Sequence, residues 1–538
     1  MVIQALLKRN TYYDSITLMS VIQFVKDQTE VDDAGAVMAT EANLALMEQA
    51  ELLPATFLAE LEKPPGSEDL LIAIRAKDEA TALAALAVAE KKLAAPAQKF
   101  VSGSVSTPTA RSLEIALRQD ASVNMAVISV AGEHAWLEAE QALRHGLHVF
   151  LFSNNVSVEQ EQRLKTLAAS KGLLLMGPDC GTAIINGVGL GFSNVAPRGS
   201  IGIVGASGTG MQQLTCLIAA AGLGISQAIG TGGRDLSETI DGIMMREGLA
   251  LLARDPQTEV IVLVSKLPSK RVAQTLLATA AQCGKPVVAI FLGIAPEEFG
   301  PAASNIKLAR THTGGAELAV SLAGGDSKRV PGNSALVALQ PQLAAYRANL
   351  APSQRYIRAL YSGGTLCYEA MLLLSEQVGA VASNIPLRPQ WALATSEMYR
   401  GHTALDLGTD EFTRGKPHPM IDPTLRLHYL ARAAQDSETA VILLDIVLGF
   451  CSHPDPASVY APVIKRLRNE AQAAGRSLPV IVSLCGTEED PQRLSAQRAK
   501  LEASGALVFE SNKAAALAAA SLVNQTSSIS QTKEELHD

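Results

Sequence analysis

Two glycine-rich turns of the same construction carry groups that could bind a phosphate. Each follows an apolar, strand-like run and precedes a helical pattern. The first amides of a helix have no intrahelical acceptor and lie at the positive end of the helix dipole, so two such turns facing one point would hold a dianion. Neither turn is a P-loop or a dinucleotide fingerprint, and an ordinary capped strand-to-helix turn is the alternative. The turns consist of Ser207, Gly208 and Thr209 and of Ser362, Gly363, Gly364 and Thr365.

His312 is the candidate catalytic residue. It stands in the run ARTHTGGAELA, with Gly314 and Gly315 directly after it and a helical pattern beyond. An imidazole in a glycine-rich loop at a domain edge is accessible, and its charge changes near neutral pH. A surface or capping histidine is the alternative interpretation.

Three further turns follow apolar runs and could form the walls of a site. They lie in GPDCGTAI, GTGGRDLSETIDG and LDLGTDEF. For each aspartate taken singly, turn formation or helix capping explains the residue as well as function does. The candidates in these turns are Asp179, Cys180, Gly232, Gly233, Asp406 and Gly408.

The six cysteines are scattered singly, without a CxxC pair. This spacing favours reduced, buried or site-wall thiols over disulfides or a zinc site, and no base stands near any of them to activate a nucleophile. The histidines likewise show no metal-ligand spacing. We therefore expect no metal.

The elements that must position these residues are those of a multidomain α/β protein. The 538 residues correspond to three or four domains at roughly 150 residues each. Short Val/Ile/Leu runs alternate with longer Ala/Leu-rich helical patterns, which predicts doubly wound parallel sheets covered on both faces. We expect ligands at the carboxyl ends of the strands. The predicted segments are a small α/β domain at 1–95, α/β domains at 96–197, 198–325 and 355–524, a linker at 326–354 and a disordered tail at 525–538.

Composition excludes several classes of protein. The chain is 48% hydrophobic and only 18% charged, so it is globular rather than disordered. Its net charge of -8 argues against bulk binding to nucleic acid or to an anionic membrane. No apolar run approaches the roughly 20 residues that span a bilayer, and the N-terminus does not resemble a secretory signal. We expect a cytoplasmic protein with no nucleic-acid or membrane partner.

Taken in order, the motifs resemble a known enzyme superfamily. GPDCGTAI, IGIVGASGTGMQQLT, IGTGGRDLSETIDGI, GKPVVAIFLG and ARTHTGGAELA are similar to the α subunit of succinyl-CoA synthetase and related NDP-forming acyl-CoA synthetases. YSGGTLCYEAM, HTALDLGTDEF and AVILLDIVLGF resemble the carboxyl-terminal ligase domain of the β subunit. A single chain with this order is similar to the FdrA family of acyl-CoA synthetase-like proteins. The resemblance implies a Rossmann-like CoA-binding-type domain at 96–197 and flavodoxin-like ligase domains at 198–325 and 355–524.

The resemblance also implies roles for the candidate residues. In that superfamily a carboxylate is activated as an acyl phosphate and transferred to CoA, and the phosphate passes through a phosphohistidine. His312 matches the phosphohistidine, and the two glycine-rich turns match its phosphate-binding helix termini. The chain has Lys266 where the α subunit carries a glutamate that steadies the histidine. A cation there is expected to attract phosphate but not to hold the imidazole.

Two other departures concern the ligands. The 538 residues contain no counterpart of the nucleotide-binding ATP-grasp part of the β subunit. We therefore expect ATP or ADP to act only through a partner protein. The loop that opens the family's CoA-binding domain is shortened here to FVSGSVSTPTARS, which weakens the prediction of CoA. Phosphate is the ligand that both turns favour, and a homo- or hetero-oligomer is expected.

The motifs and the resemblance leave three alternative functions open. The first is an acid–thiol ligase component that acts on a small carboxylate through an acyl phosphate. The second keeps the phosphate site without CoA or nucleotide, as in a phosphate-dependent carbamoyl transfer that converts oxalurate to oxamate and carbamoyl phosphate. The third is a non-catalytic scaffold or regulatory subunit that retains the ligase fold.

Overall fold

The computed structural model divides the chain into two compact units, which are described separately. One unit comprises residues 1–116 and 414–417, and the other comprises residues 117–413 and 418–538. The structure describes residues 1–13, 15–50, 52–53, 57–58, 61, 63–94, 110–396, 398–413 and 416–524. Most of the turn-rich segment at 94–112 and the predicted tail at 525–538 lie outside the described residues.

The N-terminal unit is an antiparallel sheet with helices. Its strands lie in the order β1-β3-β2, and β3 pairs antiparallel with both neighbours. Every residue of β3 except Arg75 is fully buried, because helices cover the sheet. This pairing differs from the parallel sheets that alternating strands and helices led us to expect throughout the chain. The elements are β1 (Val2–Lys8), α1 (Ser15–Gln28), β2 (Val31–Met38), α2 (Glu41–Gln49), β3 (Leu70–Ala76) and α3 (Glu79–Ala94).

The second unit begins with a small parallel sheet, which follows helix α4 (Leu113–Gln119) at the boundary between the units. The strand order is β4-β5-β6, with both pairs parallel. Helix α6 begins at a capping box in which Ser157 and Gln160 satisfy each other's backbone amides. The elements are β4 (Met125–Ile128), α5 (Gly132–Arg144), β5 (His148–Leu151), α6 (Val158–Ser170) and β6 (Leu175–Met176).

A seven-stranded sheet follows, in the order β13-β12-β11-β9-β10-β7-β8. The first five strands are parallel, and a hairpin at Asn186-Gly187 adds β7 and β8 as an antiparallel edge. Helices α7 and α10 cover one face, and α8 and α9 cover the other. The strands are β7 (Thr182–Ile185), β8 (Val188–Gly191), β9 (Arg198–Ala206), β10 (Ile225–Gly230), β11 (Val260–Lys266), β12 (Val287–Leu292) and β13 (Ile306–Ala309), and the helices are α7 (Gly208–Ala220), α8 (Ile243–Arg254), α9 (Lys270–Ala280) and α10 (His312–Leu322).

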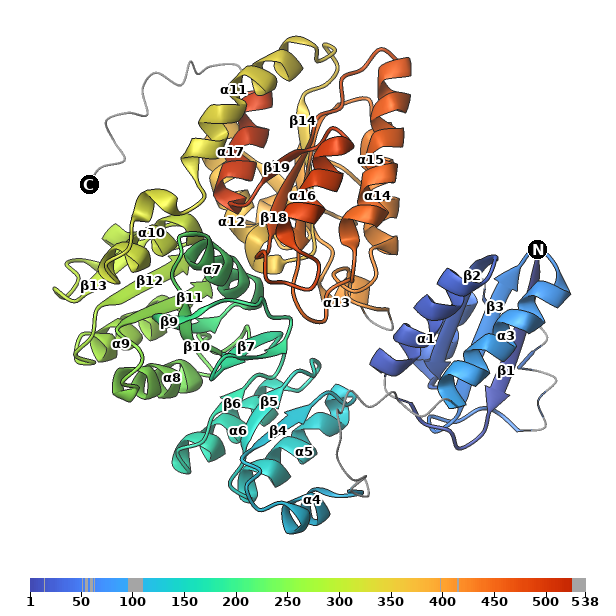
Figure 1. The fold of residues 1–538 in the computed structure, drawn as a ribbon, viewed down its shortest axis with the longest axis horizontal. Helices are drawn as coiled ribbons and strands as arrows, with labels where there is room; N and C mark the ends of the chain where they lie inside the picture. Colours follow the sequence, from blue (N-terminus) through green and yellow to red (C-terminus); the bar gives the residue numbers. More distant parts are fainter. Residues whose placement is uncertain are drawn as a thin grey trace. The chain divides into compact units, whose positions relative to one another are not determined.

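The carboxyl-terminal sheet has six parallel strands in the order β15-β16-β14-β17-β18-β19. Its central strand β17 is buried over its whole length, and alternate residues face α12 and α17 on one side and α14 and α15 on the other (Figure 1). The strands are β14 (Tyr356–Tyr361), β15 (Val381–Ser383), β16 (His402–Asp406), β17 (Thr439–Val447), β18 (Val480–Cys485) and β19 (Leu507–Phe509). The helices are α11 (Asn333–Ala348), α12 (Gly364–Val378), α13 (Asp410–Thr413), α14 (Thr424–Gln435), α15 (Pro456–Ala473), α16 (Leu494–Ala503) and α17 (Asn512–Val523).

The α/β architecture with doubly wound parallel sheets is confirmed, with one difference in a connection. The segment at 326–354, which we predicted as a linker, contains helix α11, and this helix packs on α17. The glycine and proline pairs that suggested a linker stand before the helix, at Gly324-Gly325 and Pro331-Gly332, and do not interrupt it. One apolar cluster joins α7 and α10 to α12 and α17, so the two larger sheets share a core.

Candidate functional site

The two glycine-rich turns meet. Ser207 is the N-cap of α7, and its Oγ donates a hydrogen bond of 2.8 Å to Thr365 Oγ1 in the first turn of α12. Gly363 lies so close that a Cβ there would come within 3.0 Å of the Thr209 side chain. Ser207, Gly363 and Thr365 are buried, and Thr209 is partly buried. The amino ends of two helices from different sheets therefore face one point (Figure 1).

The amino end of α7 offers free donors at this point. Ser207 Oγ accepts a hydrogen bond from Gly210 N, which satisfies one of the four amides that a helix leaves without an intrahelical acceptor. Met211 N donates to Ser207 O. Among the described residues the amides of Gly208 and Thr209 have no recorded acceptor, so they are open to a ligand, and the phosphate site predicted there stays a prediction.

The amino end of α12 is arranged differently, because a protein carboxylate already occupies part of it. The amides of Ser362 and Gly363 each donate to the Asp445 carboxylate at 2.8 Å, and Ser362 Oγ donates to it at 3.0 Å. Asp445 also forms an ion pair of 2.9 Å with Arg426. Of the four residues predicted in this turn, the geometry leaves Gly364 and Thr365 for a phosphate.

His312 is the first residue of α10 and is fully buried, so the expectation of an accessible imidazole in a loop was wrong: α10 begins at this residue and helices of the carboxyl-terminal sheet cover it. Its Nε2 atom has no hydrogen-bond partner among the described residues. Nε2 faces the first turn of α7, where a Cβ on Gly210 would lie 2.8 Å from it and 2.3 Å from Ser207 Oγ. Nε2 of the imidazole therefore lies beside the turn that carries the amides of Gly208 and Thr209.

Glu369 holds the histidine, and the sequence analysis missed it. Its Oε1 accepts a hydrogen bond of 2.7 Å from His312 N and lies 3.0 Å from His312 Nδ1. Its Oε2 accepts a hydrogen bond of 2.8 Å from Asn512 Nδ2. Burial raises the pKa of Glu369, but the charge of His312 and these hydrogen bonds outweigh burial and lower it below its ordinary value. A carboxylate therefore steadies the imidazole, although Lys266 replaces the glutamate that the family resemblance led us to look for.

A signal for Glu369 was present in the sequence. It is the acidic residue in the otherwise apolar run LCYEAMLLL, and it lies four residues after Thr365, so both point to the same face of α12. The sequence could not show that His312 would reach this face, because α10 and α12 lie on different sheets.

Lys266 and Asp406 meet at the amino end of α12. A Cβ on Gly364 would lie 2.5 Å from Asp406 Oδ2 and 3.4 Å from Lys266 Nζ. Asp406 also accepts a hydrogen bond of 3.0 Å from Gly408 N. Burial raises the pKa of Asp406 to about 6, although Lys266 acts in the opposite direction. The lysine therefore lies beside the amino end of α12, and its attraction of a phosphate stays a prediction.

The remaining wall residues form a second, neighbouring group. Cys180 Sγ donates to Thr182 O, and the thiol is buried. Gly232 has a positive φ and packs against Pro178 O, so a side chain at this position would collide with that oxygen. Gly233 has open space around it, and Asp179 is exposed. Asp179 joins this group to the amino end of α12: burial of its carboxyl raises its pKa to about 6, Lys266 acts in the opposite direction, and Asp179 in turn raises the pKa of Asp406.

No group of three or more His, Cys, Asp or Glu side chains in the described part of the chain could hold a metal ion. Over the same residues, no helix is both long and apolar enough to cross a bilayer.

Three family profiles match the chain. The CoA-ligase family matches residues 360–522, and the CoA binding domain family matches residues 197–293. The second match falls on the segment that we predicted as the α-like ligase domain. A profile described as AllF, heavy metal-associated domain, matches residues 1–108. These 108 residues contain neither cysteine nor histidine, so they lack thiolate and imidazole ligands for a heavy metal.

Similar proteins fall into two groups. The chain is 44% identical over 95% of its length to the uncharacterized protein YahF of Escherichia coli, of which it covers 97%. It is 29% identical to the mitochondrial succinate–CoA ligase subunit alpha-2 of Trichomonas vaginalis, over 41% of this chain and 73% of that one. It is 26% identical to the succinate–CoA ligase subunit alpha of Methanothermobacter thermautotrophicus, over 32% of this chain and 59% of that one.

Proposed function

Because the chain belongs to the FdrA-like family of the succinyl-CoA synthetase superfamily, we propose that it is an acid–thiol ligase component with His312 as phosphate carrier. Its substrate is a small carboxylate, activated as an acyl phosphate. The observation that carries this proposal is the unpartnered, buried Nε2 of His312, aimed at the amino end of α7 while Glu369 holds the other side of the ring.

The phosphoryl step uses only residues at this point. His312 Nε2 attacks phosphorus, so that an N–P bond forms and the bond from phosphorus to its donor oxygen breaks. The ring becomes positively charged, and Glu369 stabilises that charge through Nδ1–H. In the next step a substrate carboxylate oxygen attacks the same phosphorus, the N–P bond breaks, and an acyl phosphate leaves the ring neutral.

Backbone donors hold the phosphate during both steps. The amides of Gly208 and Thr209 come from α7, and Gly364 and Thr365 come from α12, with Lys266 beside them. Fixed dipoles of this kind stabilise charge without reorganising when the charge develops. When CoA is bound, its thiol attacks the acyl carbon, a C–S bond forms and phosphate leaves.

A partner subunit completes the reaction in this proposal. The succinate–CoA ligase relatives are named as alpha subunits. We propose that the nucleotide that charges or discharges His312 is bound by such a partner.

Phosphorylation of the full chain tests the relay directly. Incubation with a ³²P-labelled acyl phosphate such as acetyl phosphate should label the native protein at His312, in acid-labile form. His312→Asn should take up no label, and Lys307→Gln, an exposed change on the preceding strand β13, should label as the native protein does. Equal labelling of the native protein and His312→Asn would overturn the relay.

Calorimetry separates the ligase from the other two functions. Micromolar binding of CoA supports the ligase. Binding of phosphate or carbamoyl phosphate without CoA supports carbamoyl transfer. If Ser207→Ala, Ser362→Ala and His312→Asn all leave the activity of a reconstituted complex unchanged, the chain is a scaffold.

A further inference from the structure

Thr182, the first residue of β7, lies beside the amino end of α7 with an unused hydroxyl. The residue is only 3% exposed, and its Oγ1 has no hydrogen-bond partner among the described residues. A Cβ on Gly208, the first residue of α7, would lie 3.3 Å from this oxygen. Buried hydroxyls in folded proteins are nearly always hydrogen-bonded, so an unpaired one beside the open end of a helix indicates a ligand.

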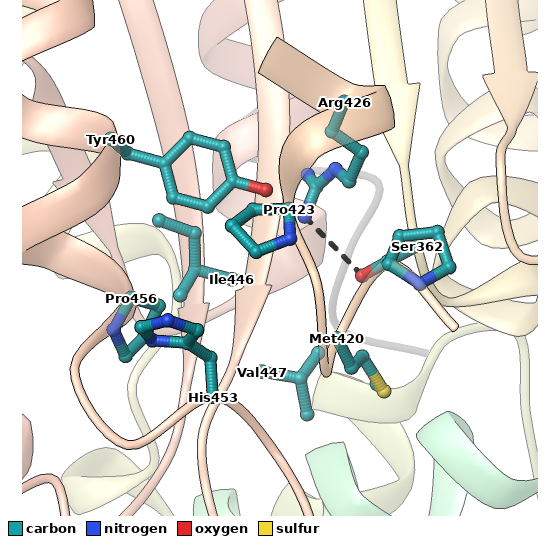
Figure 2. A pocket seen from close by; sticks show the side chains of 10 residues that line it. Ser362, Met420, Pro423, Arg426, Ile446, Val447, His453, Pro456 and Tyr460 are labelled. Carbon is teal, nitrogen blue, oxygen red and sulfur yellow. Dashed lines mark hydrogen bonds between the residues drawn. The ribbon is translucent and has the colours of Figure 1, made fainter. Parts of the chain in front are cut away.

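The serine hydroxyls of the two glycine-rich turns are already engaged. Ser207 Oγ donates across to the first turn of α12. Ser362 Oγ donates to Asp445, and it also contacts Arg426 Nη1 at 3.4 Å, which Figure 2 marks with a dashed line. Each serine would therefore have to give up a protein partner in order to donate to a ligand, whereas Thr182 would not.

Thr182 and His312 lie on opposite sides of the same helix end. Successive residues of an α-helix point about 100° apart, so the directions of Gly208 and Gly210 differ by about 200°. Gly208 faces the Thr182 hydroxyl, whereas Gly210 faces His312 Nε2. Thr209, which stands between them, faces the amino end of α12. A group held at this helix end would therefore have the imidazole on one side and the hydroxyl on the other.

We propose that Thr182 binds the carboxylate oxygen of the substrate that exchanges with His312 at phosphorus. This inference rests on the proposed function, in which a phosphoryl group at the amino end of α7 passes between the imidazole and a carboxylate. In phosphoryl transfer the attacking and leaving atoms lie roughly in line, on opposite sides of phosphorus. With Nε2 on one side, the carboxylate oxygen belongs on the other side, where the unused hydroxyl lies.

The hydroxyl stabilises charge on this oxygen and transfers no proton. When an acyl phosphate charges His312, the lone pair of Nε2 forms the N–P bond, the O–P bond breaks, and the carboxylate leaves with the electrons of that bond. Negative charge therefore grows on the oxygen that accepts the hydrogen bond from Thr182, and the hydrogen bond becomes stronger during the step. In the reverse step the same hydrogen bond orients the attacking carboxylate.

Two phosphoryl donors separate this role from phosphate binding. Acetyl phosphate releases a carboxylate, whereas phosphoramidate releases ammonia from a protonated nitrogen, which has no lone pair to accept a hydrogen bond. Thr182→Val removes the hydroxyl and keeps the shape of the side chain. In the full chain it should slow labelling of His312 by ³²P-acetyl phosphate at least about tenfold, and change labelling by ³²P-phosphoramidate less than about twofold. Thr182→Ser keeps the hydroxyl and should keep most of the labelling by acetyl phosphate.

Thr258→Val is the matched control for the loss of a buried threonine hydroxyl. Thr258 is 2% exposed, and its Oγ1 is hydrogen-bonded to Asp255 and Ser226. It stands at the amino ends of the parallel strands, whereas α7 begins at their carboxyl ends. This variant should have a lower melting temperature and label as the native protein does with both donors. Thr182→Val should show the reverse, because its hydroxyl has no protein partner to lose.

Binding to His312→Asn, which lacks the phosphate carrier, distinguishes this inference from the relay. In that background, calorimetry should show that Thr182→Val weakens binding of acetyl phosphate about tenfold and leaves binding of phosphoramidate unchanged.

The labelling rates decide wherever the native protein is labelled, and the binding comparison decides wherever it is not. Label that is insensitive to Thr182→Val, or that falls equally with both donors, overturns the role of Thr182 and leaves the relay intact. Absence of label together with a loss of acetyl phosphate binding in the Thr182→Val variant rejects the relay alone. Absence of both effects overturns both proposals.

Discussion

Glu369 Oε1 accepts a hydrogen bond of 2.7 Å from the main-chain nitrogen of His312 and lies 3.0 Å from its Nδ1. The carboxylate belongs to α12 on the six-stranded sheet, and the histidine begins α10 on the seven-stranded sheet. The contact therefore orients the imidazole and couples two domains. It also leaves Nε2 as the ring nitrogen that faces the point where the amino ends of α7 and α12 meet.

Glu369→Gln separates the role of this carboxylate as a hydrogen-bond acceptor from the role of its negative charge. The amide oxygen keeps an acceptor for His312 N, but the charge that stabilises a positive imidazole is lost. We expect phosphate labelling of His312 to fall by about 10- to 100-fold, with little change in melting temperature. Glu369→Asp should restore part of the labelling.

Glu376→Gln serves as its control. This glutamate lies on the same helix but is exposed, and it forms a long ion pair of 3.6 Å with Arg310. Its labelling rate should equal that of the native protein. If Glu369→Gln labels as fast as this control does, Glu369 has a purely structural role.

Gly210→Ala tests the direction of the imidazole. The added methyl would lie 2.8 Å from His312 Nε2 and 2.3 Å from Ser207 Oγ, so it would fill the space into which Nε2 points. We expect labelling of His312 to fall by at least about tenfold, because the in-line approach to Nε2 is blocked. Gly66→Ala, which meets no atom closer than 3.9 Å, is the matched control for the loss of a glycine. Native labelling by Gly210→Ala would mean that Nε2 is not the nucleophile.

The fold was largely predictable, because its signals are local. Apolar runs such as IGIVG and AVILLDIVLGF are buried on both faces, and this burial requires helices on both sides of a parallel sheet. The antiparallel pairing of β1 and β2 with β3 was not predictable, because strand direction depends on how the intervening helices cross the sheet. Helix α11 was missed for a local reason, since the glycines before it resembled those of a linker.

The site was predictable in part. The like construction of the turns at Ser207 and Ser362 suggested that they face one point, and the hydrogen bond from Ser207 to Thr365 shows that they do. The partner of a buried group depends on tertiary distance, which a single sequence does not contain. For that reason Glu369 was missed, and nothing in the sequence indicated that Asp445 would occupy the amides of Ser362 and Gly363.

A double-mutant cycle measures how strongly the two helix termini are joined. Ser207→Ala removes both the α7 cap and the bond to Thr365, and it should lower the free energy of unfolding by about 1–2 kcal/mol. Thr365→Val removes the bond alone. Because the two side chains are in contact, the double variant should lose less stability than the sum of the losses of the two single variants, by about 0.5–1.5 kcal/mol. Urea denaturation measures these differences, and strict additivity would show that the termini are not coupled.

Asp406 should make stability depend on pH. Its pKa is raised from 3.8 to about 6, so between these values the folded protein holds a proton that the unfolded chain has lost. Stability due to this group is therefore greatest below pH 3.8 and declines as the pH rises toward 6, by at most about 3 kcal/mol. Asp406→Asn cannot ionise, and its unfolding free energy should lack this decline.

Urea denaturation at pH 4.5 and 7.0, followed by tryptophan fluorescence, measures the effect. Both tryptophans, Trp136 and Trp391, lie in the second unit with Asp406, so the signal reports on that unit alone. At pH 7.0 Asp406→Asn should be more stable than the native protein, whereas at pH 4.5 the two should differ less. Glu138→Gln removes an exposed carboxylate from the same unit and should keep the native pH dependence. If the native protein and Asp406→Asn show the same dependence between these two pH values, folding does not raise the pKa of Asp406.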